Sequence, residues 1–516
     1  MTGVLHRRFG NHVPDILDCL AQLSNDEVPT PPKVARAMLD LLPAEVWTNP
    51  NYKWLDPFSK SGVFLREIAS RLLEGLASWE PDFDKRRDHV YRRMIYGCAI
   101  TTMTGMIARR SLYCSRDASS DLSVVKFESP DGNLPFIPTE HAFVNQRCTV
   151  CGAPEGLERE GRENYAYAFI HDTYPTQELS DMKFDVIVGN PPYQIDSEGN
   201  SRTRPVYQLF VQKAISMNPR YLVMITPSRW FTGGLALDQF RTDMLADRHL
   251  AKMVDNPKLF DCFPGVEIKG GVSYFLWDRE HDGDCEFSTR IDGEIVSTLT
   301  RDLRHGKGVL IRSNAAEAIL AKIEAKGEPS IASKLSSQKP FGFLSNFSDY
   351  HLKPEKDSVL LVKRDRMPAY VHPDQITHGH PMIDPIKVLT PEAGDGHGRI
   401  PAIVTGNPFV VSGNSVCTQT FLVAGTFGTE YTAQRFAAYL RTKFVRFLVH
   451  QRKVSQHTTS DTYAFVPDIP MDRDWTDAAL YERYELSAED IAVIESQIRP
   501  MSATDVVESE WEDSEQ

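Results

Sequence analysis

The stretch FDVIVGNPPY (184–193) constrains the fold of this chain more than any other part of the sequence. Its apolar residues follow one another with almost no alternation, which is typical of a strand covered on both faces. Two consecutive prolines cannot donate hydrogen bonds to a neighbouring strand, so the strand should end at Asn190. A buried strand that ends in this way indicates an α/β sheet with a ligand site at the carboxyl ends of its strands.

Strand and helix patterns alternate along the first 300 residues. Strands are predicted at 52–58, 94–100, 184–190, 220–230 and 270–279, and helices at 30–43, 61–76 and 205–217. This alternation predicts an α/β fold with a doubly wound, mainly parallel, Rossmann-like sheet.

A chain of 516 residues is too long for one hydrophobic core. We predict a catalytic domain at 1–300 with an insertion at about 112–172, a mixed α+β domain at 301–470, and an acidic region at 471–516. The last dozen residues should be disordered. Residues 301–460 carry 21 Lys and Arg against 13 Asp and Glu, which suits contact with phosphates, although an ordinary solvated surface explains the excess equally well.

Cysteine content and hydropathy predict the compartment. No apolar run approaches the roughly 18 residues of a membrane helix, and the first 15 residues lack the apolar segment of a secretory signal. Eight cysteines in a chain of this length do not make a disulfide scaffold. We therefore expect a cytoplasmic protein without a membrane partner.

The NPPY segment suits chemistry at a conjugated amine. The lone pair of such a nitrogen is delocalised, and two acceptors that take its N–H bonds would favour a nucleophilic, pyramidal nitrogen. The side-chain oxygen of Asn190 and the carbonyl of Pro191 can be these acceptors, since Pro191 and Pro192 fix the backbone. The ring of Tyr193 offers a flat surface for stacking a planar substrate.

Three segments occur in a recognisable order: TPPKVARAML (30–39), DPFSKSGVFL (56–65) and GNPPY (189–193). With the basic module that follows, they resemble the gamma-class S-adenosylmethionine-dependent N6-adenine DNA methyltransferases of restriction–modification systems. The resemblance covers roughly residues 25–280. It implies methyl transfer from S-adenosylmethionine to N6 of an adenine flipped out of duplex DNA, with 301–470 as the target-recognition domain. A separate restriction or helicase–nuclease subunit is a further partner that it suggests.

The resemblance also assigns roles to single residues. Cofactor binding falls to Thr30, Asp56, Pro57, Gly62 and Asp172, and catalysis to Asn190, Pro191, Pro192, Tyr193 and Phe263. Thr30 would contact the methionine carboxylate of the cofactor, and Asp56 would accept a hydrogen bond from its amino group. Asp172 would contact the cofactor's adenine amine, and Phe263 would form a second aromatic wall.

Two positions depart from the family pattern. Lys60 stands where the family's turn usually has its first glycine. Ala99 and Ile100 stand where an acidic residue normally binds the ribose hydroxyls, a role in which Thr101 or Thr102 could substitute. Both departures concern affinity for the cofactor more than its identity.

The insertion contains a Cys-x-x-Cys motif at Cys148 and Cys151, the spacing of a zinc knuckle. Cys114 and His171 bracket the insertion and complete a predicted structural zinc site. With His171 next to Asp172, the zinc would also help to fix the wall of the cofactor pocket. An ordinary pair of reduced thiols and a redox pair are the alternatives.

Other functions share parts of this pattern. A protein methyltransferase acting on glutamine amides would use the same acceptors of the NPPY segment. RNA adenine is an alternative substrate. A non-catalytic DNA-binding subunit would tolerate Lys60 and Ala99. For DNA contact the basic stretches 362–366 and 442–461 are candidates, and no nuclease pattern of Asp, Glu and Lys is evident.

Overall fold

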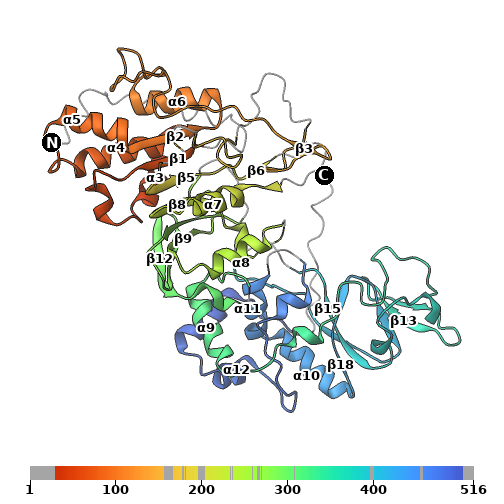
Figure 1. Ribbon diagram of the computed structural model, residues 1–516. Coiled ribbons are helices and arrows are strands. Elements are labelled where there is room, and N and C mark those ends of the chain that lie inside the picture. Colours follow the sequence, from red (N-terminus) through yellow and green to blue (C-terminus); the bar gives the residue numbers. More distant parts are fainter. Residues whose placement is uncertain are drawn as a thin grey trace. The chain divides into compact units, whose positions relative to one another are not determined.

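The computed structural model describes residues 29–155, 167–176, 179, 182–195, 204–232, 234, 236–258, 260–263, 268, 270–306, 308–394, 400–453 and 457–503. The chain divides into two compact units, Met1–Leu310 and Ile311–Gln516, each described by itself below (Figure 1). The predicted domain boundary at residues 300 and 301 lies ten residues before this division. The last dozen residues, predicted to be disordered, lie outside the described residues.

An eight-stranded sheet forms the centre of the first unit, in the order β12-β11-β9-β10-β8-β5-β1-β2. Its strands are β1 Trp54–Ser59, β2 Ile95–Ala99, β5 Val186–Gly189, β8 Tyr221–Pro227, β9 Leu250–Asn256, β10 Val272–Asp278, β11 Cys285–Ile291 and β12 Glu294–Arg301. Neighbours β2, β1, β5 and β8 are parallel, whereas β10 is antiparallel to β8 and β9, and β12 to β11. The predicted α/β fold is confirmed, with a sheet that is mixed.

Successive residues of the buried strands point to opposite faces of the sheet, so both faces carry apolar side chains. Helices cover both of these faces. Leu55, Ile187 and Leu222 belong to one core cluster, and their neighbours Trp54 and Val186 to the other. Helices α7 Tyr207–Ser216 and α8 Asp238–Ala246 contribute to the first cluster, and α3 Pro32–Leu39, α4 Val63–Gly75 and α6 Thr102–Tyr113 to the second (Figure 1).

A segment of the insertion lies along the outer edge of β2. The N–H of Gly97 donates to Asn133 (2.9 Å) and that of Ala99 to Pro135 (2.9 Å). Residues 133–136 therefore stand where a third strand of the sheet would run. Beyond them, β3 Phe143–Val144 and β4 Arg147–Cys148 form a short hairpin.

The second unit combines small sheets with helices. Its sheets have the orders β14-β13-β17 and β16-β15-β18. The strands are β13 Val359–Val362, β14 Pro368–Val371, β15 Ile386–Pro391, β16 Phe409–Val411, β17 Ser415–Cys417 and β18 Phe421–Phe427. The helices are α9 Asn314–Glu324, α10 Glu430–Arg441, α11 Lys443–Arg452, α12 Asp477–Arg483 and α13 Ala488–Gln497.

The acidic C-terminal region contains α12 and α13, which pack within this second unit. The ring of Tyr484 stacks on Phe444 of α11, with centroids 5.0 Å apart. Glu495 and Asp490 form ion pairs with Lys443 and Lys322. Part of the unit's positive charge is therefore neutralised by its own C-terminal helices.

None of the helices that the structure describes is both long enough and apolar enough to span a bilayer.

Candidate active site

Asn190 directly follows β5 and is almost completely buried, with 4% of its surface exposed. Its Nδ2 donates a hydrogen bond to Oγ1 of Thr30 (3.0 Å), a residue 160 positions earlier in the chain. This bond orients the amide, and among the described residues the buried Oδ1 has no hydrogen-bond partner. Leaving a buried acceptor without a donor destabilises the folded state. The arrangement therefore favours binding of a ligand that donates to Oδ1.

Gly189 allows β5 and β1 to come close together just before Asn190. A Cβ atom on Gly189 would lie 2.2 Å from the Phe58 ring and 3.1 Å from Oδ1 of Asp56. Only glycine fits this position, and no role was predicted for it from the sequence. A glycine directly before Asn190 was the feature of the sequence that could have indicated this close approach.

Asp56 is buried in β1, next to an irregularity in the pairing of β1 with β2 that includes Pro57. Its Oδ1 accepts a hydrogen bond from the N–H of Phe58 (3.4 Å). Burial raises the pKa of Asp56 to about 7, against the opposing effects of the Phe58 N–H, the Ser59 side chain and the charge of Lys60. This carboxyl can therefore change charge near neutral pH.

One cavity brings Asn190, from the predicted catalytic set, together with part of the predicted cofactor set. It is lined by Thr30, Asp56, Phe58, Lys60, Ser61, Gly62, Val63, Phe64 and Asn190. These residues come from the carboxyl ends of β1 and β5, the beginning of α4, and the segment before α3. This is the edge at which ligands bind in open α/β sheets.

Gly62 precedes α4 with a φ of +73°, a conformation that favours glycine. A Cβ atom there would lie 2.8 Å from the carbonyl oxygen of Ala108, so the glycine also lets α6 approach α4. Lys60, at the departure from the family pattern, is largely buried, and its Nζ lies 6.0 Å from the centroid of the Tyr193 ring. The lysine therefore places a cation beside the predicted stacking residue.

Thr101, considered as a substitute for the missing acidic residue, caps α6. Its Oγ1 accepts a hydrogen bond from the N–H of Thr104 (3.1 Å), and the Thr104 hydroxyl accepts one from the N–H of Thr101 (2.9 Å). This capping box explains the threonine without a cofactor. Thr102 is the first residue of α6.

Tyr193 and Phe263, the residues predicted to form two aromatic walls, lie next to each other. Their rings make an edge-to-face contact with centroids 6.3 Å apart, and Phe263 is buried. The carbonyl of Tyr193 accepts a hydrogen bond from the N–H of Val206 (3.1 Å) at the beginning of α7. Pro191 and Pro192 are buried beside them, which leaves this turn little freedom. Stacking on a substrate stays a prediction.

The structure does not bring Asp172 to the cavity. Its carboxylate is exposed and forms an ion pair with Lys213 of α7. The assignment placed Asp172 at the third strand of the sheet, but residues 133–136 occupy that edge of β2. We therefore correct this assignment.

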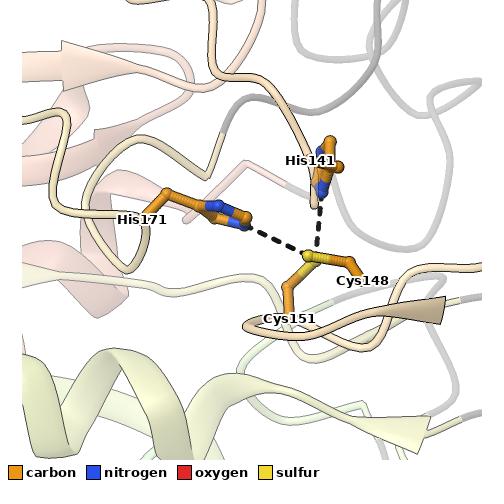
Figure 2. Close-up of side chains that lie close together, drawn as sticks. All are labelled: His141, Cys148, Cys151 and His171. Atoms are coloured by element: carbon orange, nitrogen blue, oxygen red, sulfur yellow. Dashed lines mark hydrogen bonds between the residues drawn. The ribbon is translucent and has the colours of Figure 1, made fainter. Parts of the chain in front are cut away.

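The predicted zinc ligands need one replacement (Figure 2). Cys148, Cys151 and His171 lie together, and their fourth neighbour is His141; the ligand atoms of these four lie within 4.8 Å of one another. Cys114 is not among them, because it is the exposed C-cap residue of α6 with a φ of +63°. His141, seven positions before Cys148, was missed, since a single histidine gives no spacing signal.

The described residues of the basic stretch 442–461, namely 442–453 and 457–461, are mostly internal. In α11 Arg446 is 1% exposed, and it donates to the carbonyls of Arg441 (3.0 Å), Ile403 (3.2 Å) and Arg499 (2.5 Å). Arg452 is paired with Asp461 (2.8 Å). These cations hold the second unit together, which argues against this stretch as the main DNA contact.

The stretch 362–366 is different, because Arg364 and Arg366 are exposed in the turn between β13 and β14. The guanidinium of Arg366 lies over the Phe409 ring, 4.2 Å from its centroid. Lys363 bonds to the hydroxyl of Tyr350 (3.0 Å). This turn can present positive charge to a ligand.

A polar pair at the ends of β8 and β9 was not predicted. Ser228 donates to Asp255 (2.9 Å), and both side chains are buried. β9 runs parallel to β8, since both are antiparallel to β10, so this pair lies at the same edge of the sheet as Asn190. An aspartate in the apolar strand KMVDN was the signal that could have found it.

Comparison with known proteins points to one family. The model of the Eco57I restriction-modification methylases matches residues 93–263, which include Asn190 to Tyr193. An uncharacterised adenine-specific methylase of Mycoplasma pneumoniae is 34% identical over 342 residues, covering 60% of this chain and 80% of that protein.

Solved structures with weaker similarity also belong to restriction–modification systems. The type I methyltransferase subunit from Streptococcus thermophilus has a TM-score of 0.34 at 15% identity, covering 60% of this chain and 55% of that one. A nuclease-deletion mutant of the type ISP enzyme LlaGI, bound to a DNA substrate mimic, has a TM-score of 0.47 at 10% identity, covering 84% and 46%. The chain spans about half the length of these proteins.

Proposed function

The chain belongs to the Eco57I restriction-modification methylase family, and we propose that it transfers the methyl group of S-adenosylmethionine to N6 of adenine in duplex DNA. The observation that carries this proposal is the buried Oδ1 of Asn190, which has no partner among the described residues and is held in place by Thr30 at the edge of the cavity. The order of the TPP, DPF and NPPY segments along the chain supports a gamma-class arrangement.

The target amine donates one N–H to Oδ1 of Asn190 and the other to the carbonyl of Pro191. Both acceptors are fixed before the substrate binds, so little reorganisation is needed when the nitrogen becomes pyramidal. The Tyr193 ring stacks on the flipped base, and Phe263 supports that ring from its edge. A general base is not needed before the methyl group moves, because the lone pair of the nitrogen is the nucleophile.

The residues of the cavity fit S-adenosylmethionine. Asp56 offers a carboxylate for an ammonium group, and the beginning of the 13-residue helix α4 offers the positive end of a helix dipole for a carboxylate. Phe58 and Phe64 supply apolar surface. When bound, the cofactor supplies an electrophilic methyl group on sulfur.

The second unit is the proposed target-recognition domain. The exposed arginines 364 and 366 would contact phosphates, and these contacts would stabilise the duplex from which the adenine is extruded. A separate restriction or helicase–nuclease subunit is the proposed partner for cleavage of unmodified DNA.

The test is transfer of tritium from labelled S-adenosylmethionine to duplex DNA of mixed sequence, followed by nucleoside analysis. We expect label in N6-methyladenine with the wild-type chain and with Asn51→Ala, an exposed asparagine of the same unit. The Asn190→Ala variant should incorporate label about a thousandfold more slowly. Label in RNA or in glutamine-containing peptides, but not in DNA, would replace the substrate, and absence of label from all three would refute methyl transfer.

A further inference from the structure

We propose that His141, Cys148, Cys151 and His171 bind one zinc ion, and that this ion holds residues 167–174 behind Phe58, a residue that lines the active-site cavity. The proposal concerns the structure of the insertion, so its metal-binding half does not depend on the substrate of the enzyme.

The distances among these side chains suit a tetrahedral zinc site. Sγ of Cys151 lies 3.4 Å from Nδ1 of His141, and Sγ of Cys148 lies 3.9 Å from Nε2 of His171. Two ligands of a tetrahedral zinc ion are roughly 3.3–3.8 Å apart, given Zn–S and Zn–N bonds of about 2.3 and 2.0–2.1 Å. Since all four ligand atoms lie within 4.8 Å of one another, movements of up to about 1 Å would complete the site. Both imidazoles point toward the sulfur atoms in Figure 2.

The backbone around the two cysteines has the form of a zinc knuckle. Asn145 and Gln146, with positive φ values of 51° and 62°, form the two-residue turn between β3 and β4. After Cys148 the chain turns back, so that the N–H of Gly152 donates to the Cys148 carbonyl (2.9 Å). This tight turn brings the two cysteines close enough to bind one ion.

Two alternatives fit the arrangement less well. A redox pair needs the two cysteines but no convergence of two imidazole nitrogens on them. An open catalytic site needs a free position on the metal, whereas four protein ligands close a tetrahedral site. The arrangement therefore favours a structural ion.

The segment that carries His171 packs behind Phe58, a residue that lines the cavity. Two positions before His171, the Phe169 ring makes an edge-to-face contact with Phe58, with centroids 6.1 Å apart. Phe58 lines the cavity, and Phe169 is buried. The ion pair between Asp172 and Lys213 joins the same segment to α7. Fixing His171 therefore fixes the aromatic contact behind the cavity.

Metal content of the purified full-length protein tests the ligand set. We expect about one zinc per chain in the wild type and in Cys114→Ser, and less than about 0.2 in His141→Asn and Cys148→Ser. Since these variants could misfold, cobalt is also substituted for zinc in the wild type. The cobalt protein should show thiolate charge-transfer absorption and the intense visible bands of a tetrahedral site. A wild type that neither contains zinc nor takes it up, or a Cys114→Ser variant that loses it, would overturn the proposed site.

Hydrogen exchange tests whether the zinc ion holds residues 167–174 in place. The N–H groups of His171, Thr173 and Tyr174 donate to the carbonyls of Tyr167 and Ala168. Removal of zinc with a chelator should accelerate their exchange at least about tenfold, and zinc should restore it. Helix α10 in the other unit is the internal control. Unchanged exchange in 167–174 after verified removal of zinc would refute the positioning role.

Discussion

Asn190 and Arg446 are polar residues buried to a similar degree, but they differ in how their polar atoms are satisfied. Arg446 donates to three backbone carbonyls, those of the nearby Arg441 and of Ile403 and Arg499 in more distant segments. Within the described part of the chain, Asn190 donates once, to Thr30, and its side-chain acceptor has no partner. Complete internal pairing indicates a structural residue, whereas a buried atom left unpaired at a cavity indicates a ligand. Burial alone does not distinguish a structural residue from one that binds a ligand.

The largest effect that this contrast predicts is on catalysis. Asn190→Ala should lower the rate of methyl transfer by about a thousandfold, because it removes an acceptor of the target amine. The free energy of unfolding should change by no more than about 1 kcal/mol, since only one internal hydrogen bond is lost. Single-turnover kinetics and urea unfolding measure the two quantities. A variant that unfolds readily and keeps its transfer rate would reverse the assignment.

The reverse pattern is expected for Arg446→Met. Three carbonyl groups lose their donor, so the second unit should lose about 3 kcal/mol or more of stability. Thermal unfolding of the full chain, with Arg364→Met as the exposed control, measures this. The control should stay within about 0.5 kcal/mol of the wild type. Equal stability of both variants would mean that the pairing of Arg446 has no structural role.

The next effect concerns pH. The pKa of Asp56 is raised from 3.8 to about 7, so the folded protein keeps its proton where the unfolded chain has released it. Stability should therefore fall as the pH rises from 4 to 7. Binding of S-adenosylmethionine should have the opposite slope, because only the carboxylate attracts an ammonium group.

Titration calorimetry from pH 5.5 to 7.5 measures the cofactor affinity. We expect it to rise by up to about tenfold per pH unit below the pKa of Asp56. Asp56→Asn should bind weakly at all these pH values and lose this dependence. A wild-type affinity that does not vary with pH would separate Asp56 from the cofactor.

The smallest effect is expected on the surface of the second unit. Arg364→Ala should weaken DNA binding a few-fold and lower the slope of log affinity against log salt by about 0.9, the value for one lost phosphate contact. Arg473→Ala, also an exposed arginine of this unit, serves as the control. An equal loss with both variants would indicate only a general charge effect.

Strand ends that are marked by neighbouring prolines were predictable from the sequence. Asn190 and Asp56 follow or end apolar runs next to prolines, so their place at the strand ends could be derived, and the structure brings both to one cavity with Thr30. β12 could not be derived, because most of its residues are exposed and give no apolar pattern. His141 depends on a contact across the fold, and the Asp172 assignment failed because another segment occupies the edge of β2.

The close approach at Gly189 restricts how this protein can change during evolution. A methyl group at that position would overlap the ring of Phe58. Substitutions at positions 58 and 189 should therefore be inherited together, with a larger residue at one tolerated only beside a smaller residue at the other. Gly189→Ala alone should be deleterious, and Phe58→Leu in the same chain should partly rescue it.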